Sequence, residues 1–82
     1  VVASLEPNPF LNSAVLHINS KENAEVVISI FSSIGQNVFS ERLKLFEGEN
    51  KRSLNLNQLS SGLYQLVISD NNGSRVLKII KG

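Results

Sequence analysis

The sequence predicts an all-β fold of seven antiparallel strands, and three observations lead to this prediction. Fifteen Val and Ile stand beside twelve Ser and ten Asn but only three Ala, a composition that favours strands joined by polar turns. Apolar and polar residues alternate with a period of two, and no segment shows the period of a helix. Turn residues separate the strands at a spacing of about 8 to 12 residues. This pattern fits an immunoglobulin-like β-sandwich better than a barrel.

Four strands are predicted in the first half of the chain, at residues 1–5, 14–18, 26–31 and 38–45. The first must end at the corner Pro7-Asn8-Pro9, because proline has no N–H group to donate to a strand ladder. Gly35 closes the hairpin before the fourth strand, since glycine readily adopts a positive φ. The residues expected on the inner face of the second and third strands are Ala14, Leu16, Ile18, Val26, Ile28 and Ile30. In the fourth strand, one face carries Phe39, Glu41, Leu43 and Leu45, and the solvated face carries Val38, Ser40, Arg42 and Lys44.

Three strands are predicted in the second half, at residues 53–59, 63–69 and 75–80. The first follows a turn at residues 47–50 and is marked by Leu54, Leu56 and Leu59. The second has one face formed by Tyr64, Leu66 and Ile68. Asn72-Gly73 predicts a type I′ hairpin turn, because Asn and Gly tolerate the positive φ that both central residues need. Leu59 to Tyr64 is typical of a tyrosine corner, in which the Tyr64 hydroxyl bonds to upstream backbone in a structural role.

Charge and cysteine content narrow the possible function classes. Eight Lys and Arg against seven Asp and Glu leave a net charge of +1, far from the basic excess of nucleic-acid binders, so we expect no nucleic-acid partner. The absence of cysteine excludes a disulfide framework and a thiolate metal site. The apolar runs are far shorter than the roughly 20 residues of a membrane span, so we expect no membrane insertion.

The length of 82 residues predicts one domain, residues 1–82, because this few apolar side chains cannot build two cores. The chain starts at Val1 without an initiator Met or the apolar segment of a signal peptide. We therefore expect a piece of a longer polypeptide, with any export signal upstream. The sequence does not predict an oligomeric state.

Catalytic and metal sites are not expected. His17 and Asp70 are the residues available to complete a serine triad, but one lies mid-strand and the other in a distant turn. The Glu residues flank turns or face solvent, which disfavours a glycosidase pair. Residues 70–73 lack the distant bidentate Glu of a calcium loop, and turn formation explains their Asp and Asn. We therefore predict no catalytic residue, no cofactor and no metal.

Blocks of sequence that follow one another along the chain resemble a known family. They are Glu6-Pro7-Asn8-Pro9-Phe10, then residues 28–38, then Leu59-Ser60-Ser61-Gly62-Leu63-Tyr64, then Lys78-Ile79-Ile80-Lys81. Together they resemble the C-terminal sorting domain of the type IX secretion system, its type A class, over essentially the whole chain. Ser32 stands where this family often has Asp, and Gly82 follows the terminal Lys81.

The resemblance implies a seven-stranded sandwich that covalently follows a secreted cargo domain of a Gram-negative bacterium. Its implied partners are the type IX outer-membrane translocon, which would recognise it, and a sortase-like protease, which would remove it after export. The cargo would pass through the periplasm and be secreted or held at the cell surface. The residues expected to serve translocon recognition are Pro7, Asn8, Pro9, Gly35, Gly62, Tyr64, Lys78, Ile79, Ile80 and Lys81.

The last strand supports two interpretations. Its positive charges are Arg75, Lys78 and Lys81, without a negative one, on a strand expected at a sheet edge. In the first interpretation, Lys78 and Lys81 project charge beside Ile79 and Ile80, and the strand adds to a receptor sheet by β-augmentation. In the second, the lysines only protect the edge from aggregation.

A second function class remains open, a non-catalytic adhesion or carbohydrate-binding sandwich appended to an extracellular enzyme. Such a module is expected to present a platform of exposed aromatic side chains. The chain has no Trp, and its candidates are Phe10, Phe31, Phe39 and Phe46. An exposed strip of these residues would favour this class over an export address.

Overall fold

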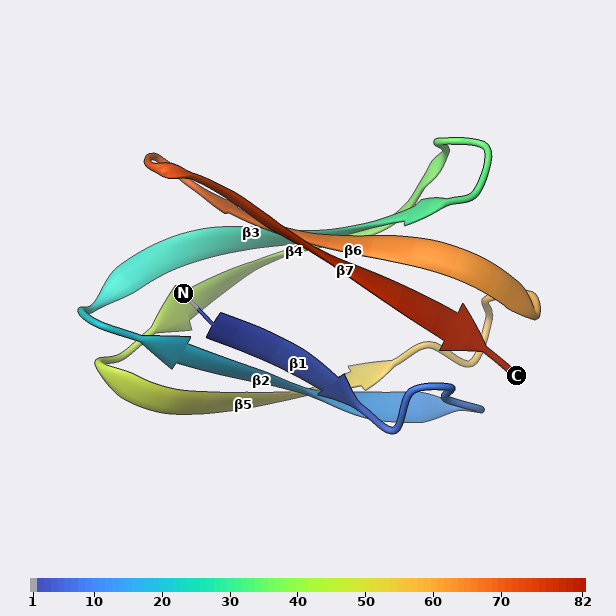
Figure 1. The fold of residues 1–82 in the computed structure, drawn as a ribbon, viewed down its shortest axis with the longest axis horizontal. Helices are drawn as coiled ribbons and strands as arrows, with labels where there is room; N and C mark the ends of the chain where they lie inside the picture. The colour runs from blue at the N-terminus through green and yellow to red at the C-terminus, as the bar shows by residue number, and fades with distance from the viewer. Residues whose placement is uncertain (1) are drawn as a thin grey trace.

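The computed structural model describes residues 2–82 and contains seven strands in two antiparallel sheets packed face to face (Figure 1). The strands are β1 (Val2–Glu6), β2 (Ser13–Ser20), β3 (Ala24–Ser32), β4 (Asn37–Leu45), β5 (Gly48–Asn55), β6 (Gly62–Asp70) and β7 (Gly73–Lys81). One sheet has the order β1-β2-β5 and the other the order β4-β3-β6-β7. This arrangement confirms the all-β class and is compatible with an immunoglobulin-like sandwich. Within residues 2–82, no helix is long and apolar enough to cross a membrane.

The core lies between the sheets and is built from the period-2 alternation of the strands. The residues predicted to face inward in β2, β3 and β6 are buried: Ala14, Leu16, Ile18, Val26, Ile28, Ile30, Tyr64, Leu66 and Ile68. In β4, Leu45 is buried, and Phe39 and Leu43 pack against the core from half-buried positions. These faces are therefore confirmed. Because the domain is small and its stability is expected to be modest, each of these buried side chains matters to folding.

The fifth strand differs from its prediction. It spans Gly48–Asn55 rather than residues 53–59, so the turn expected at residues 47–50 is wrong for residues 48–50, which belong to the strand. Two inward positions of this strand are polar, and tertiary contacts satisfy them. The Asn50 amide accepts from Phe46 N–H at 2.9 Å and donates to the carbonyls of Phe46 and Ile18. An alternation search for apolar residues therefore misses this strand.

The second inward polar residue of β5 is Arg52, which pairs with Glu41 on β4 of the opposite sheet. The guanidinium donates to both carboxylate oxygens, from Nε at 3.1 Å and from Nη2. The hydrogen bonds and the charge of Glu41 raise the pKa of Arg52 above its ordinary value. This pair joins the two sheets where their edge strands β4 and β5 face each other.

Leu56 and Leu59, predicted on the fifth strand, lie in the loop that follows it. Leu56 is fully buried, and its N–H donates to the Asn12 carbonyl at 3.0 Å. Leu59 packs against the core from a half-buried position, with its N–H bonded to the Leu56 carbonyl. The leucine spacing thus reports burial correctly, although these residues are not in a strand.

The hairpin between β6 and β7 is real, but it is not type I′. Asp70 pairs with Gly73, so Asn71 and Asn72 are the central residues. Within residues 2–82 only glycines have positive φ, among them Gly73 at +146°, so neither asparagine is left-handed. The Asp70 Oδ1 accepts from Asn72 N–H at 2.8 Å, which forms an Asx-turn. This side-chain bond, with glycine at the fourth position, favours a turn whose two central residues have negative φ. The type I′ turn predicted from Asn-Gly alone would need positive φ at both.

Candidate recognition site at one end of the sandwich

The blocks singled out in the sequence gather at one end of the sandwich. Four segments lie there: the connections at residues 7–12, 33–36 and 56–61, and the C-terminal end of β7. Figure 1 shows these segments on the right, whereas β1 begins toward the other end. Ser32 at the end of β3 pairs with Tyr64 at the start of β6, which in turn pairs with Ile79 of β7. We call the segments 7–12, 33–36, 56–64 and 78–82 the motif end.

Asn8 fastens the proline corner to the last strand. Its side-chain Nδ2 donates to the Lys78 carbonyl at 3.1 Å, and its Oδ1 accepts from Ile80 N–H at 3.0 Å. A single side chain thereby satisfies two backbone groups on the outer edge of β7, much as a neighbouring strand would. Pro7 and Pro9 flank it, both with cis peptide bonds, and both are exposed.

Phe10 continues this contact along β7. Its N–H donates to the Ile80 carbonyl at 2.9 Å, and its carbonyl accepts from Gly82 N–H at 2.8 Å. The Phe10 side chain is fully buried and belongs to the core. The corner therefore both covers the edge of β7 and anchors in the core. Sequence reasoning missed this role of Phe10, because it depends on a contact across about 70 residues of chain.

Lys81 points into the domain, which corrects the expectation that it projects charge. Its side chain is 8% exposed, the Nζ donates to the Leu56 carbonyl at 3.1 Å, and it lies 5.8 Å from the centre of the Phe10 ring. The carbonyl dipole and the ring face both stabilise the ammonium group. The period of two would have placed Lys81 on the same face as Ile79, which is fully buried.

The outer edge of β7 is also less available than expected. β7 is an edge strand, as predicted. Between Lys78 and Gly82, however, its outward backbone groups already bond to Asn8 and Phe10. Addition of a receptor strand along this stretch would require the corner to move away. The β-augmentation expected for residues 78–82 is therefore in conflict with the folded structure.

The tyrosine corner is confirmed. Tyr64 is 7% exposed, and its hydroxyl donates to the Ser60 carbonyl at 2.6 Å. The neighbouring Ser61 hydroxyl donates to the Gly82 carbonyl at 3.0 Å, so this loop also holds the chain end. Gly62 begins β6 with a φ of +151° and pairs with Lys81.

Gly35 serves the hairpin between β3 and β4. It has a φ of +83°, which disfavours other residues, and its N–H donates to the Ser32 carbonyl at 2.9 Å. A Cβ added at Gly35 would meet open space, so the backbone conformation rather than crowding calls for glycine. Ile34 beside it is 85% exposed and stands at the tip of the hairpin.

Replacing Tyr64 with Phe is expected to lower the free energy of unfolding by about 1 to 2 kcal/mol, because the Ser60 carbonyl loses its partner in a partly buried place. Urea denaturation followed by circular dichroism measures this change. The aromatic ring and its packing are retained, so the m-value should not change. Equal unfolding midpoints for the variant and the parent would contradict a stabilising hydroxyl.

The structure does not bring the residues considered for catalysis together. His17 faces outward on β2, 3.3 Å from Glu49 and 3.8 Å from Glu6, whereas Asp70 ends β6 in the other sheet. Among residues 2–82, no group of three or more His, Cys, Asp or Glu is arranged to hold a metal ion. The aromatics considered for carbohydrate binding do not form an exposed strip either. Phe10 is buried, and Phe31 and Phe39 are half-buried. Phe46 is exposed in the connection between β4 and β5.

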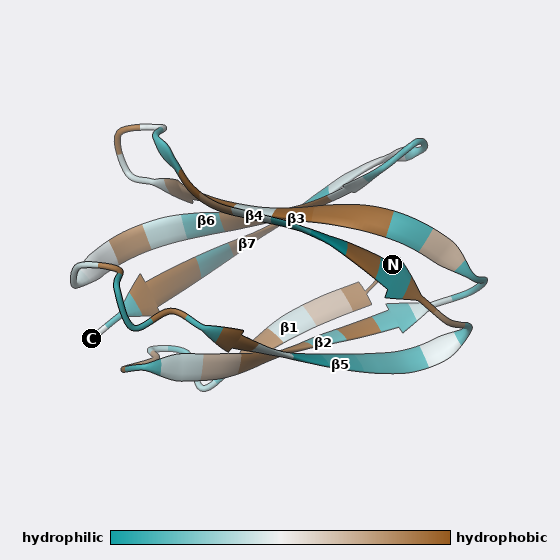
Figure 2. Cartoon of the chain, turned by 180° about the vertical axis from the view of Figure 1, so that it is seen from behind, coloured by the Kyte–Doolittle hydropathy of each residue, from teal (hydrophilic) through white to brown (hydrophobic). Residues whose placement is uncertain are grey.

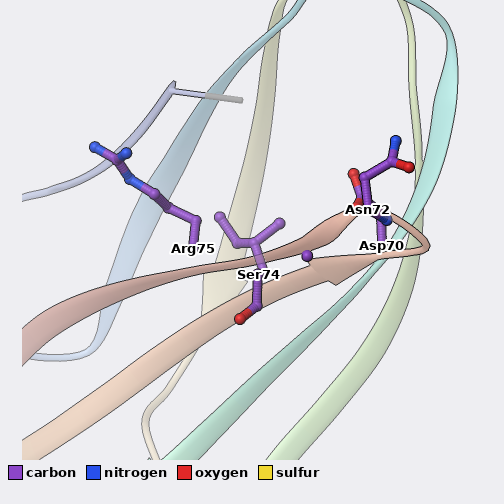
Figure 3. A pocket seen from close by; sticks show the side chains of 6 residues that line it. Asp70, Asn72, Ser74 and Arg75 are labelled. Carbon is purple, nitrogen blue, oxygen red and sulfur yellow. Dashed lines mark hydrogen bonds between the residues drawn. The ribbon is translucent and has the colours of Figure 1, made fainter.

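A shallow depression of about 300 Å³ lies at the β6–β7 hairpin, far from the motif end. In Figure 3, Asp70 and Asn72 stand together on one side, and Arg75 points away from them. The Asp70 carboxylate is engaged in the turn itself. The Asp70 and Arg75 side chains thus do not converge on a common point in this depression.

Comparison with protein families identifies the family of the chain. Residues 4–82 match the profile of the secretion system C-terminal sorting domain. The chain belongs to this family. The sorting domain is thus a C-terminal secretion signal of the type IX system, and the family resemblance predicted from the sequence is confirmed. The family is one of sorting signals rather than enzymes.

A solved structure shares the fold of the sorting domain. It is the crystal structure of dimeric latent PorU from Porphyromonas gingivalis, which superposes with a TM-score of 0.73 at 24% sequence identity. The match covers 96% of the sorting domain but 9% of the PorU chain. No protein with a curated description matches the chain.

Proposed function

We propose that the folded sorting domain, and not a linear terminal peptide, is the export address that the type IX outer-membrane translocon recognises. One observation carries this proposal: sequence blocks about 70 residues apart hydrogen-bond to one another at the motif end. The groups of Asn8, Phe10, Ser61 and Gly82 meet only in the native fold. A receptor that accepts unrelated cargo proteins needs such a common feature. The domain acts by binding and has no catalysis of its own.

The residues expected to serve recognition divide into two groups by exposure. Those that a receptor can reach are Pro7, Asn8, Pro9, Gly35, Gly62, Lys78 and Ile80. Those that are buried are Tyr64, Ile79 and Lys81. We propose that the buried group contributes to export through folding, by holding β6, β7 and the corner together. Direct contact with the translocon falls to the exposed group.

The proposal includes a cargo domain that precedes the sorting domain, as in its family. β1 begins toward the end of the sandwich that lies away from the motif end, so a preceding domain leaves the motif end accessible (Figure 1). The cargo passes through the periplasm to the cell surface or the medium. A sortase-like protease then removes the sorting domain. The polypeptide between cargo and sandwich is the segment on which such a protease acts.

A reporter fusion tests the proposal. The reporter carries a periplasmic export signal at its N-terminus and the 82-residue chain at its C-terminus, and it is produced in a bacterium with a type IX system. We expect it in the medium or on the surface, shortened by the sorting domain. The same fusion should remain in the periplasm of a strain that lacks the translocon, as should the reporter without the domain. A folded fusion that stays in the periplasm of the competent strain would refute the export address.

A further inference from the structure

The outward faces of the two sheets differ in chemistry. On the four-stranded sheet, the outward apolar residues are Val27, Phe31, Val38, Leu63, Val67, Val76 and Ile80. On the three-stranded sheet, they are Val2 and Val15, among Ser, Asn, Glu, Lys and His. In Figure 2, β5 is teal over most of its length and β3 is brown through its centre, where the colour reflects inward and outward residues together. The four-stranded sheet thus presents an apolar face, and such faces mark interaction sites.

The strand register arranges the apolar side chains on this face in rows. Leu63 lies opposite Ile80, and Val67 lies opposite Val76, so β6 and β7 form two apolar cross-strand pairs. Leu63, Val76 and Ile80 are 50%, 51% and 45% exposed. Lys78 stands between the two rows, next to Gln65. We call the outward surface formed by Leu63, Gln65, Val67, Val76, Lys78 and Ile80 the β6–β7 face.

The charge on this side of the sheet is positive. Its cations are Arg42, Lys44 and Lys78. Within residues 2–82, Glu25 is the one outward acidic residue of the four strands, and it lies 4.0 Å from Arg42 at the far end of β3. Lys78 has no ion-pair partner among the described residues. A cation surrounded by exposed Val and Ile gains most from a carboxylate that a partner supplies as the face is covered.

We propose that the β6–β7 face docks on an apolar protein surface of the secretion machinery that places an acidic side chain opposite Lys78. This inference rests on the export function proposed above and adds the surface and the chemistry of the partner. A second copy is the wrong occupant, because face-to-face pairing would bring the positive groups together. An anionic membrane is also disfavoured, because Lys78 is the one cation of the β6–β7 face, which therefore lacks the Lys and Arg cluster of lipid-binding surfaces.

A matched pair of valine substitutions tests the apolar part. Val76→Glu places a carboxylate on the β6–β7 face, and Val2→Glu places one on the outward face of the three-stranded sheet. Both residues are exposed and both lie on edge strands. We expect Val76→Glu to lower the export rate of the reporter fusion about tenfold, which corresponds to about 1.4 kcal/mol of binding free energy. Val2→Glu should export at the parental rate, and both variants should unfold at the parental urea midpoint.

A matched pair of lysine substitutions tests the charge and does not depend on the valine variant folding. Lys78→Glu should reduce export by a similar factor, and Lys78→Arg should retain it. Lys51→Glu on β5, an exposed strand lysine on the other outward face, should have no effect. Parental export of both Val76→Glu and Lys78→Glu, or equal loss in the control variants, would overturn the inference while leaving the export function intact.

Two further outcomes separate the alternatives. Failure of the unmodified fusion to leave the cell refutes the export function and, with it, this inference. Binding of the isolated domain to phosphatidylcholine–phosphatidylglycerol vesicles, lost in Lys78→Glu, would replace the protein partner with a membrane. We expect the domain to remain unbound in a sedimentation assay with such vesicles.

Discussion

A chain shortened to end at Leu77 is expected to lose cooperative folding. The missing residues 78–82 include Ile79, which is fully buried, and removal of a buried Ile side chain alone costs about 2 to 5 kcal/mol. The truncation also removes the pairing of residues 78–81 with β6 and every bond to Asn8 and Phe10. Small domains have total stabilities of about 5 to 15 kcal/mol, so these losses together are expected to exceed what an 82-residue sandwich can tolerate.

Urea denaturation monitored by circular dichroism measures this loss of cooperative folding. The matched control is Lys78→Ala in the full chain, because Lys78 is exposed and the control leaves the strand in place. Its stability should stay within about 0.5 kcal/mol of the parent. A truncated chain that unfolds at the parental midpoint would show that the last strand is dispensable. Loss of export after truncation therefore does not by itself identify a terminal recognition peptide, since the fold is lost with it.

Replacing Phe10 with Ala is expected to lower the free energy of unfolding by about 3 to 5 kcal/mol. The ring is fully buried, and the small side chain would leave a cavity where the corner anchors in the core. The backbone bonds of Phe10 to Ile80 and Gly82, and the contact of its ring with Lys81, depend on this anchor. The effect is therefore expected to reach beyond the corner and loosen β7.

Leu11→Ala is the matched control for Phe10→Ala. Leu11 is the next residue in the same loop and is 68% exposed, so its truncation should change stability by less than about 0.5 kcal/mol. Hydrogen exchange of the Ile80 and Gly82 amides adds a local measurement, since both N–H groups bond to the corner. Equal destabilisation by the two substitutions would mean that the corner is not anchored through Phe10.

Exposed and buried positions of most strands were predictable, because alternation is a local property of the chain. β2, β3 and β6 bury the side chains that the period of two assigned to the core, and Tyr64 makes its predicted corner. The family resemblance was also predictable, since it rests on short blocks at set places along the sequence. None of these inferences requires knowing which strands pair.

The predictions of inward and outward faces were wrong where polar side chains on an inward face bond to groups elsewhere in the fold. Asn50 and Arg52 face inward although they are polar, because backbone carbonyls and the Glu41 carboxylate satisfy them. Lys81 is inward for the same reason, with the Leu56 carbonyl and the Phe10 ring as partners. Lys81 is buried, so its partners must compensate for lost water, whereas the Arg52 side chain is still 45% exposed. The partners Ile18, Glu41 and Leu56 lie 11 to 32 residues away along the chain.

Local sequence was thus sufficient for the number of strands, the inner faces of β2, β3, β4 and β6, and the family of this sorting domain. The motif end required the packed sandwich, because Asn8 reaches the carbonyl of Lys78 only after two sheets have brought residues 70 positions apart together. The same holds for the β6–β7 face, whose rows arise from the pairing of Leu63 with Ile80 and of Val67 with Val76. Alternation is set by neighbouring residues along one strand, whereas hydrogen bonds and cross-strand rows depend on which strands become neighbours in space.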